Sequence, residues 1–364
     1  ARKSFGSIFT SVIFLTFQCF SILVILLYFF HILIQNSHPL RFFMKHSLGG
    51  LGAVFCLILL LACPALALTG ARNGLLLWAD VVLPTLLPFM ICSGMIVALN
   101  GVPLLTKPLF PFLSRFMGLS QPGSFVFITG LLCGYPMGAR MDSRFLEEGR
   151  IELNEARTLL AVSNHPSPMF ILGYICVQAA SLFSSSNACP PWIFLTALYL
   201  PILPVSFLAK KCYHLNQEAS LCRQDNYKSE HTHVSFDTHL MDCLETMEKI
   251  GLYIMIFSIL ALYLSALPDS LLPLTLRCAL LGAVEITTGI RAISGSVPGF
   301  AGALLITAAG AFGGISGIFQ TKSVLKSAGL SIRHYILWKF FHSVLSCVAF
   351  ALCFFINQSL QIGI

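Results

Sequence analysis

The sequence predicts an all-α polytopic membrane protein with two pseudo-repeated halves that contain broken or re-entrant helices. Of its 364 residues, 56% are hydrophobic and only 10% are charged, whereas a soluble domain carries about 25% charged residues. Apolar runs long enough to cross a hydrocarbon core of ~30 Å recur along the whole chain. Proline and glycine interrupt several of these runs, and such breaks in two halves are typical of transporters.

Charge and cysteine usage exclude other classes of protein. The formal net charge is +7, but Lys and Arg are scattered through short loops and form no basic stripe. Lys and Arg distributed in this way reflect the orientation of the protein in the membrane and do not indicate a nucleic-acid partner. Most of the 13 cysteines lie inside apolar runs, where Cys behaves as a small hydrophobe, so we infer no disulfide framework.

Residues 1–43 are interpreted as an N-terminal extension. Met44, followed by Lys45 and the apolar stretch Leu48–Leu68, is typical of the start of a bacterial membrane protein. The extension is therefore either an extra span or sequence translated from upstream of a start at Met44, and the second interpretation is slightly favoured.

Two membrane halves are expected on either side of one polar segment. The first half covers residues 44–209, where Pro84 and Pro88 should kink an early span. Residues 210–249 form the polar loop and an amphipathic helix. The second half, residues 250–364, should supply the spans or half-spans Gly251–Leu267, Leu271–Ile293, Val297–Ile318 and Ile332–Ile356. The expected total is about nine to ten membrane elements.

A weak internal repeat relates the two halves. The segment "TGLLCGYPMGARMDSRFLEEGRI" can be laid on "AGAFGGISGIFQTKSVLKSAGLSI" at a constant offset, so that Gly130 meets Gly310, Gly134 meets Gly314, Ser143 meets Ser323 and Gly149 meets Gly329. In both copies a glycine-broken apolar segment runs into a helix with charges. Such paired segments indicate where a transporter binds its solute, here around Gly134 in one copy and Gly314 and Ser316 in the other.

The stretch "LLCGYPMGAR" supports two interpretations. Gly130, Gly134 and Gly138 recur every four residues, as on a face where two helices approach closely. Pro136 interrupts the helical hydrogen bonds, however, and Arg140 follows at once. Because irregular backbone at membrane depth is tolerated only when it is buried in protein or lines a cavity, we favour a re-entrant tip on a solute path.

"SNHPSPMF" predicts a second break. The helix before it should end near Asn164, since Pro166 restricts the residue that precedes it. Ser167 then acts as N-cap with Pro168 at the first helical position. The free N–H groups of such a helix end bind anions, and Asn164 adds a neutral donor and acceptor. His165 is expected to be a satisfied polar residue and not a ligand.

Glu285, in "LLGAVEITTGI", is the carboxylate that lies well inside an apolar run. A structural role would pair it with Arg277 or Arg291. Because a buried unpaired carboxylate is costly, the alternative is that it binds a cation or takes up a proton. We predict that Glu285 and Thr288 couple H⁺ or Na⁺.

Enzyme and metal chemistry are weaker alternatives. "GISG" at Gly314–Gly317 matches a rhomboid-type serine protease motif with His342 as a conceivable base, but four residues are a weak signal and the repeat already explains the glycines. The Cys and His residues of the polar loop fit no structural zinc motif. We therefore expect no enzyme, metal site or resident cofactor.

In order along the chain, "GYPMGAR", "NEARTLLAVSNHPSPMFILG" and "LLGAVEITTGI" resemble the sporulation integral membrane protein family called YlbJ or SpoVV, whose members carry nucleoside-recognition Gate domains. The resemblance covers about Met44 to Ile364. It implies a protein of the outer forespore membrane that moves dipicolinic acid from the mother cell. It maps the family motifs onto Gly134, Tyr135, Pro136, Gly138, Asn164, Pro168, Glu285 and Gly289.

The expected solute is a planar aromatic dianion. Arg140, the helix end at Ser167 and the Tyr135 ring would suit it, whereas a neutral nucleoside would need more amide and carboxylate hydrogen-bonding groups. The expected partners are thus the lipid bilayer and this small solute, with a homo-oligomer left open. A nucleoside-type transporter and a non-transporting scaffold for spore envelope assembly are the alternatives.

Overall fold

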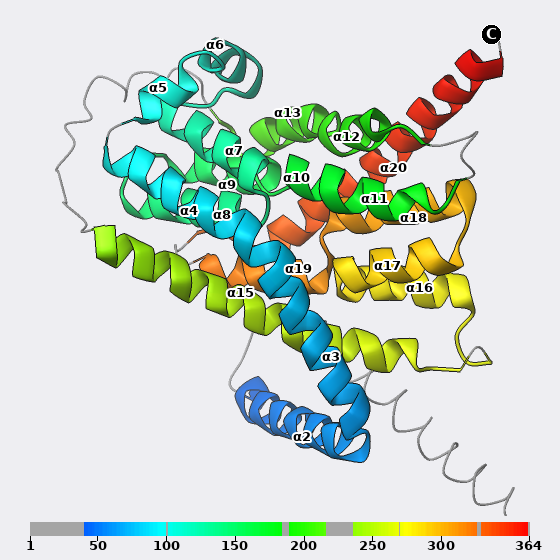
Figure 1. The fold of residues 1–364 in the computed structure, drawn as a ribbon. Helices are drawn as coiled ribbons and strands as arrows, with labels where there is room; N and C mark the ends of the chain where they lie inside the picture. Colours follow the sequence, from blue (N-terminus) through cyan, green and yellow to red (C-terminus); the bar gives the residue numbers. More distant parts are fainter. Residues whose placement is uncertain are drawn as a thin grey trace, which may run out of the picture.

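The computed structural model describes residues 40–99, 101–183, 189–215, 236–268, 270–325 and 329–362, with residues 40–49, 361 and 362 described by their backbone only. Every regular element in these ranges is a helix (Figure 1). The first half contains α2 (Leu40–Ala62), α3 (Pro64–Leu77), α4 (Leu83–Ala98), α5 (Val102–Thr106), α6 (Phe110–Phe112), α7 (Gln121–Cys133), α8 (Met137–Glu147), α9 (Leu153–Val162), α10 (Pro168–Phe170), α11 (Cys176–Ala180), α12 (Pro191–Tyr199) and α13 (Ile202–Cys212).

The second half contains α15 (Phe236–Ser265), α16 (Leu274–Val284), α17 (Ile286–Ser296), α18 (Gly299–Phe312), α19 (Gly314–Val324) and α20 (Ile332–Ile362). Three π-helical turns, Trp78–Val82, Leu113–Met117 and Ile171–Ile175, extend α3, α6 and α10. Among the described residues, five continuous helical segments are long and apolar enough to cross a membrane, and a bent pair makes a sixth. The predicted all-α polytopic fold is confirmed.

Two pairs of helices fold back on themselves as hairpins at the centre of the described structure. A Cβ on Gly130 would lie 2.9 Å from the Cα of Gly138, so α8 folds back along α7. A Cβ on Gly289 would meet the Cα of Gly282 at 2.1 Å, so α16 and α17 form a second helical hairpin (Figure 1). The predicted span Leu271–Ile293 is thus two half-spans that meet at Glu285.

The two halves interlock through α15, which crosses α3 (Figure 1). Glycines allow this approach, because a Cβ on Gly70 would lie 2.7 Å from the Cα of Ile259 and one on Gly74 2.7 Å from the Cα of Met255. Trp78 anchors the crossing by donating its indole N–H to the carbonyl of Met247 at 2.9 Å. The crossing is a small-residue helix contact of the kind common in membranes.

Two expected boundaries differ from the structure. The apolar stretch Leu48–Leu68 is divided at Cys63, which adopts φ −134° and ψ 64° in front of Pro64, because proline disfavours a helical residue before it. The boundary expected at residue 249 falls inside α15, which runs unbroken from its amphipathic start into its apolar end. Residues 1–39 of the N-terminal extension and residues 216–235 of the polar loop lie outside the described ranges.

The proposed repeat has a counterpart in the backbone. Gly134 and Gly314, which the offset pairs, have φ values of +84° and +69°, and Gly149 and Gly329 have +67° and +101°. L-residues with a side chain rarely adopt such conformations. In both copies a helix therefore ends at a glycine with positive φ; the next helix starts three residues later at Met137 in the first copy and at once at Gly314 in the second.

Candidate functional site

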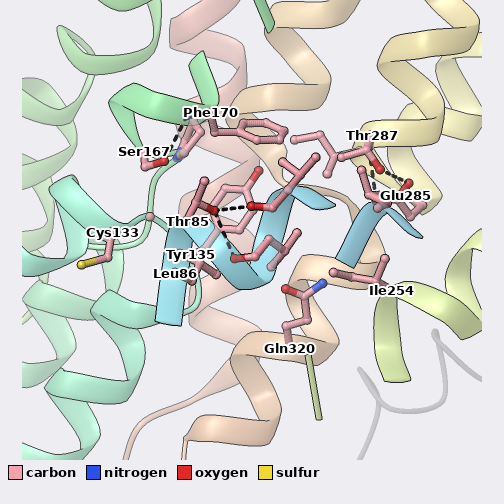
Figure 2. Close-up of a pocket in the computed structure, with 16 residues that line it drawn as sticks. Thr85, Leu86, Cys133, Tyr135, Ser167, Phe170, Ile254, Glu285, Thr287 and Gln320 are labelled. Atoms are coloured by element: carbon pink, nitrogen blue, oxygen red, sulfur yellow. Dashed lines mark hydrogen bonds between the residues drawn. The ribbon is translucent and has the colours of Figure 1, made fainter. Parts of the chain in front are cut away.

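A cavity of about 70 Å³ lies where the broken helices converge. Its wall includes the ends or breaks of α7, α10 and α16–α17 together with one side of α4, α15 and α19. Figure 2 shows the side chains that point toward it, among them Thr85, Tyr135, Ser167, Glu285 and Gln320. Four predicted site residues line the cavity, namely Gly134, Tyr135, Ser167 and Glu285. Seven others do not: Pro136, Gly138, Arg140, Asn164, Thr288, Gly314 and Ser316.

The first break is a helical hairpin tip, and its glycines allow the close approach that their spacing predicted. Gly134 ends α7 with a positive φ, and a Cβ there would lie 2.9 Å from the backbone nitrogen of Ser167. Cβ atoms on Gly130 and Gly138 would both lie about 2 Å from the carbonyl oxygen of Ser163, at 2.0 and 2.1 Å. The glycines thus allow close packing, and what they pack against is the second break.

The second break follows α9, and the predicted cap is confirmed. Ser167 is extended, and its hydroxyl accepts a hydrogen bond from the backbone nitrogen of Phe170 at 3.2 Å, with Pro168 at the first helical position. The Tyr199 hydroxyl donates to the carbonyl of Pro166 at 2.9 Å and satisfies an acceptor that the break leaves open. The hairpin tip at Gly134 and the second break at Ser167, which we call the two tips, therefore form one packed unit beside the cavity.

The third break is made by Glu285, which interrupts α16 and caps α17. Its carboxylate is buried and accepts from the backbone nitrogens of Thr287 at 3.2 Å and Thr288 at 2.7 Å, and from the Thr287 hydroxyl at 2.6 Å. The helix end supplies a partial positive charge as well. No cationic side chain of the described residues pairs with Glu285, so the expected ion pair with Arg277 or Arg291 is not formed. Thr288 contributes its backbone N–H.

The fourth break separates α18 from α19 at Gly313, whose φ is +83°. A Cβ on the next residue, Gly314, would lie 3.3 Å from the backbone nitrogen of Ile286, so this break lies against the third. Ser316 is buried and accepts from the Gln320 amide at 3.0 Å. His342 instead contacts the carbonyl of Leu198 at 3.0 Å, and no hydrogen bond joins it to Ser316 to form a protease-like pair.

The remaining wall of the cavity comes from the first long helix. The π-helical turn Trp78–Val82 connects α3 to α4. The Thr85 hydroxyl donates a hydrogen bond to the carbonyl of Val81 at 2.6 Å (Figure 2). Such turns often occur at functional sites. The sequence predicted a kink here from Pro84 and Pro88 but could not distinguish a π-helical turn from a simple bend.

Asn164 joins three helices beneath the tips. Its amide nitrogen donates to the Thr321 hydroxyl at 3.0 Å and the Tyr335 hydroxyl at 3.1 Å, and its side-chain oxygen accepts from the backbone nitrogen of Ala139 at 3.3 Å. Asn164 is almost fully buried and lies behind the cavity wall. It positions the second break and does not reach the cavity.

Arg140 lies apart from the cavity. Its guanidinium donates to the carbonyl of Asp242 at 3.2 Å and lies 3.9 Å from the Cys243 sulfur, both on the polar start of α15. The tip therefore does not carry this charge toward a bound solute, although the sequence places Arg140 only four residues after Pro136.

Lys339 is the cation that the sequence reasoning missed. It belongs to α20, is 1% exposed, donates its ammonium to the carbonyl of Asn164 at 3.0 Å, and lies 5.5 Å from the centre of the Tyr135 ring. A lysine inside an apolar run is a signal for function. Its position near the start of the last span resembled that of a lysine whose stem snorkels to the interface.

The described residues contain no group of three or more His, Cys, Asp or Glu side chains that could hold a metal ion. Cys222, His231 and His233 of the polar loop lie outside the described ranges. His165 was expected to be a satisfied polar residue. This prediction is wrong: His165 is fully buried against the ring of His342, with ring centres 4.3 Å apart, and its ring nitrogens make no hydrogen bond of normal geometry with the described residues.

Comparison with known proteins agrees with the resemblance in sequence. The chain is 26% identical over 319 residues to the sporulation integral membrane protein YlbJ of Bacillus subtilis (strain 168), and the match covers 78% of this chain and 77% of that protein. No family model matches the chain, and no solved structure matches it. This similarity over about three quarters of both chains, together with the multi-pass helical fold, supports membership of the YlbJ family of integral membrane proteins of sporulation.

Proposed function

We propose that this protein transports a small solute across a bacterial membrane during sporulation, and that the solute is the anion dipicolinate crossing the outer forespore membrane. The observation that carries the proposal is that three helix breaks, at Gly134, Ser167 and Glu285, line one cavity inside the membrane-spanning body, with the fourth break packed against the third. Because irregular backbone at membrane depth is costly unless it is buried in protein or lines a cavity, three breaks in the wall of one cavity favour a solute site there.

Transport accounts for the breaks better than the two other classes do. A scaffold for spore envelope assembly needs no buried Glu285 or Lys339. An intramembrane protease would need a nucleophile beside a base, and the hydroxyl of Ser316 is engaged by Gln320 instead. We therefore propose that the protein is not an enzyme and that it works with the bilayer, a small solute and no nucleic acid.

The charges around the cavity favour an anionic solute that moves with a cation. The ends of α10 and α17 place partial positive charge at the cavity, and the Lys339 amine, which is positive when protonated, lies behind Tyr135. Glu285, however, lines the same cavity, and two anions close together repel each other at low dielectric. A dianion would enter more readily if Glu285 took up H⁺ or held Na⁺, which is the coupling that we propose.

The cavity is small in this structure. At about 70 Å³ it is well below the ~300–1,000 Å³ of sites that enclose drug-sized ligands. The tips must therefore separate before a planar aromatic acid can enter, so the structure corresponds to a closed state in the proposed transport cycle.

The first test is uptake of radiolabelled dipicolinate into proteoliposomes that contain the full chain, with a nucleoside as the competing solute. We expect saturable dipicolinate uptake that an imposed H⁺ or Na⁺ gradient accelerates. The exposed variant Glu248→Gln, on α15 and outside the cavity, is the matched control and should transport like the wild type.

Each other outcome overturns part of the proposal. Uptake of the nucleoside alone would keep the transporter and replace the solute by a neutral one. Uptake of neither solute, by protein that gel filtration and a sharp thermal transition show to be folded, would favour the scaffold.

A further inference from the structure

A cluster of three buried basic side chains lies behind the cavity wall. Lys339 and His342 come from α20 and His165 from the break between α9 and α10, and we call these three residues the basic cluster. All three are at most 1% exposed. The two imidazoles lie with ring centres 4.3 Å apart, and Lys339 donates to the carbonyl of Asn164, the residue next to His165.

The charge of the basic cluster is not balanced. No carboxylate of the described residues pairs with Lys339, whose ammonium has three N–H groups and makes one hydrogen bond, to a neutral carbonyl. The ring nitrogens of His165 make no hydrogen bond of normal geometry with the described residues. A buried cation without a counter-ion is strongly unfavourable, so the basic cluster has donors to spare and lacks an anion.

A second source of positive charge borders the basic cluster. Helix α19 starts at Gly314 with no side-chain cap, and a Cβ on Gly313 would lie 3.6 Å from the Tyr135 ring and 3.9 Å from the Cε atom of Lys339. The free N–H groups of this 11-residue helix therefore begin beside Lys339. A helix N-terminus and an ammonium at one place suit a carboxylate.

Tyr135 separates the basic cluster from the cavity. Its ring lines the cavity (Figure 2) and faces Lys339 on the other side. The Tyr135 hydroxyl is buried and has no hydrogen-bond partner among the described residues. Because Tyr135 lies on the hairpin tip between Gly134 and Pro136, separation of the tips would join the two spaces.

We propose that the basic cluster, with the Tyr135 hydroxyl and the N-terminus of α19, is the subsite that receives a carboxylate group of the solute. Lys339 supplies the charge, the hydroxyl and the helix end supply further donors, and Tyr135 swings aside when the tips separate. The charge that selects an anion is thus that of Lys339 and not that of Arg140. This inference rests on the proposed transport of an anion but can be tested by binding alone.

The test measures the thermal stability of the purified full-length protein in detergent against dipicolinate and against its neutral diamide, pyridine-2,6-dicarboxamide. We expect dipicolinate to raise the Tm of the wild type in a concentration-dependent manner and the diamide to have little effect. Lys339→Met should weaken dipicolinate binding about 30-fold or more, whereas Lys322→Met, at an exposed position of α19, should leave binding unchanged.

The Tm without ligand separates a binding role from a structural one. If Lys339 serves the solute, Lys339→Met removes an unpaired buried charge, and the Tm of the unliganded protein should stay the same or rise. If Lys339 instead holds Asn164 in place, the Tm falls. Should Lys339→Met not fold, the structural role is established and the inference is overturned. Tyr135→Phe gives a second readout, because it keeps the ring and should weaken dipicolinate binding by about 3- to 10-fold.

Three other results would also overturn the inference. One is unchanged dipicolinate binding by Lys339→Met. Another is loss of binding in Arg140→Gln with Lys339→Met unaffected. The third is a wild-type protein whose Tm is raised neither by dipicolinate nor by two other anions, benzoate as a simple aromatic carboxylate and inorganic phosphate. Because none of these measurements requires transport, failure of the subsite and failure of the proposed function can be told apart.

Discussion

At the scale of single residues, the proposed function depends most on two buried charged side chains, neither of which is paired with a side chain of opposite charge among the described residues. Glu285 is stabilised by two backbone N–H groups and one hydroxyl and not by a cation. Lys339 contacts a carbonyl and an aromatic ring and no carboxylate of the described residues. The two charges lie on opposite sides of Tyr135, one in the cavity wall and one behind it.

Glu285→Gln tests the proposed coupling. Glutamine has one acceptor oxygen, so its NH₂ group would face an N–H donor, and the loss of charge-assisted hydrogen bonds should lower stability by about 1–3 kcal/mol. We expect the variant to exchange internal for external dipicolinate. An imposed H⁺ or Na⁺ gradient should no longer drive accumulation of dipicolinate inside the vesicles. Accumulation equal to that of the wild type, measured in the same vesicles, would exclude Glu285 as the coupling group.

Gly134→Ala and Gly149→Ala form a matched pair of substitutions. Both glycines have positive φ, at +84° and +67°, so alanine should cost each about 1–3 kcal/mol of backbone strain. A Cβ on Gly149 meets nothing within 4 Å, whereas one on Gly134 would lie 2.9 Å from the Ser167 nitrogen. We expect similar small losses of Tm from strain, a further loss for Gly134→Ala, and loss of uptake in that variant alone. Equal uptake in the two variants would mean that contact between the tips is dispensable.

At the scale of helices, the sequence indicated the breaks that glycine and proline make. Gly134–Pro136 and Pro166–Ser167 were identified as breaks because proline cannot continue a helix and Ser is a preferred cap. The break at Glu285 was not predicted as a hairpin, since neither proline nor a glycine in left-handed conformation marks it. There the buried carboxylate itself acts as the cap, and its local sequence also suits a continuous span.

Other parts of the site depend on contacts between distant helices. Arg140 was assigned to the solute because it follows the tip, but the turn of α8 directs it to α15. Lys339 was passed over because its burial depends on Asn164 and Tyr135, which lie about two hundred residues earlier in the chain. Charge near a break can be read from a sequence, whereas the direction of a side chain on a helix depends on what packs against that helix.

At the scale of the whole molecule, the two halves are held together by contacts that neither could make alone. Helix α15 packs on α3, and α20 packs on α12 and α18, so the second half covers surfaces of the first. Asn164 of the first half bonds to Thr321 and Tyr335 of the second. The cavity belongs to both halves.

This interlocking can be tested by dividing the chain between residues 225 and 226 and co-expressing the two parts. We expect a tag on one part to capture the other from detergent extract. Gly70→Leu with Gly74→Leu should abolish capture, since any Cβ there would meet the backbone of α15. Gly173→Leu, where a Cβ would meet nothing within 4 Å, is the control. Capture that survives the double substitution would mean that the other contacts between the halves, such as those of α20 with α12 and of α19 with α8, suffice to join them.

The close contact of Gly134 with Ser167 has a consequence for the rate of turnover. In the proposed transport cycle the solute has to separate packed helix ends before it can bind. Part of its interaction free energy is then used for opening, and its apparent affinity is lowered by the rarity of the open form. We therefore expect weak binding and fast release, which would suit a compound that is abundant on one side of the membrane and is delivered in bulk to the other.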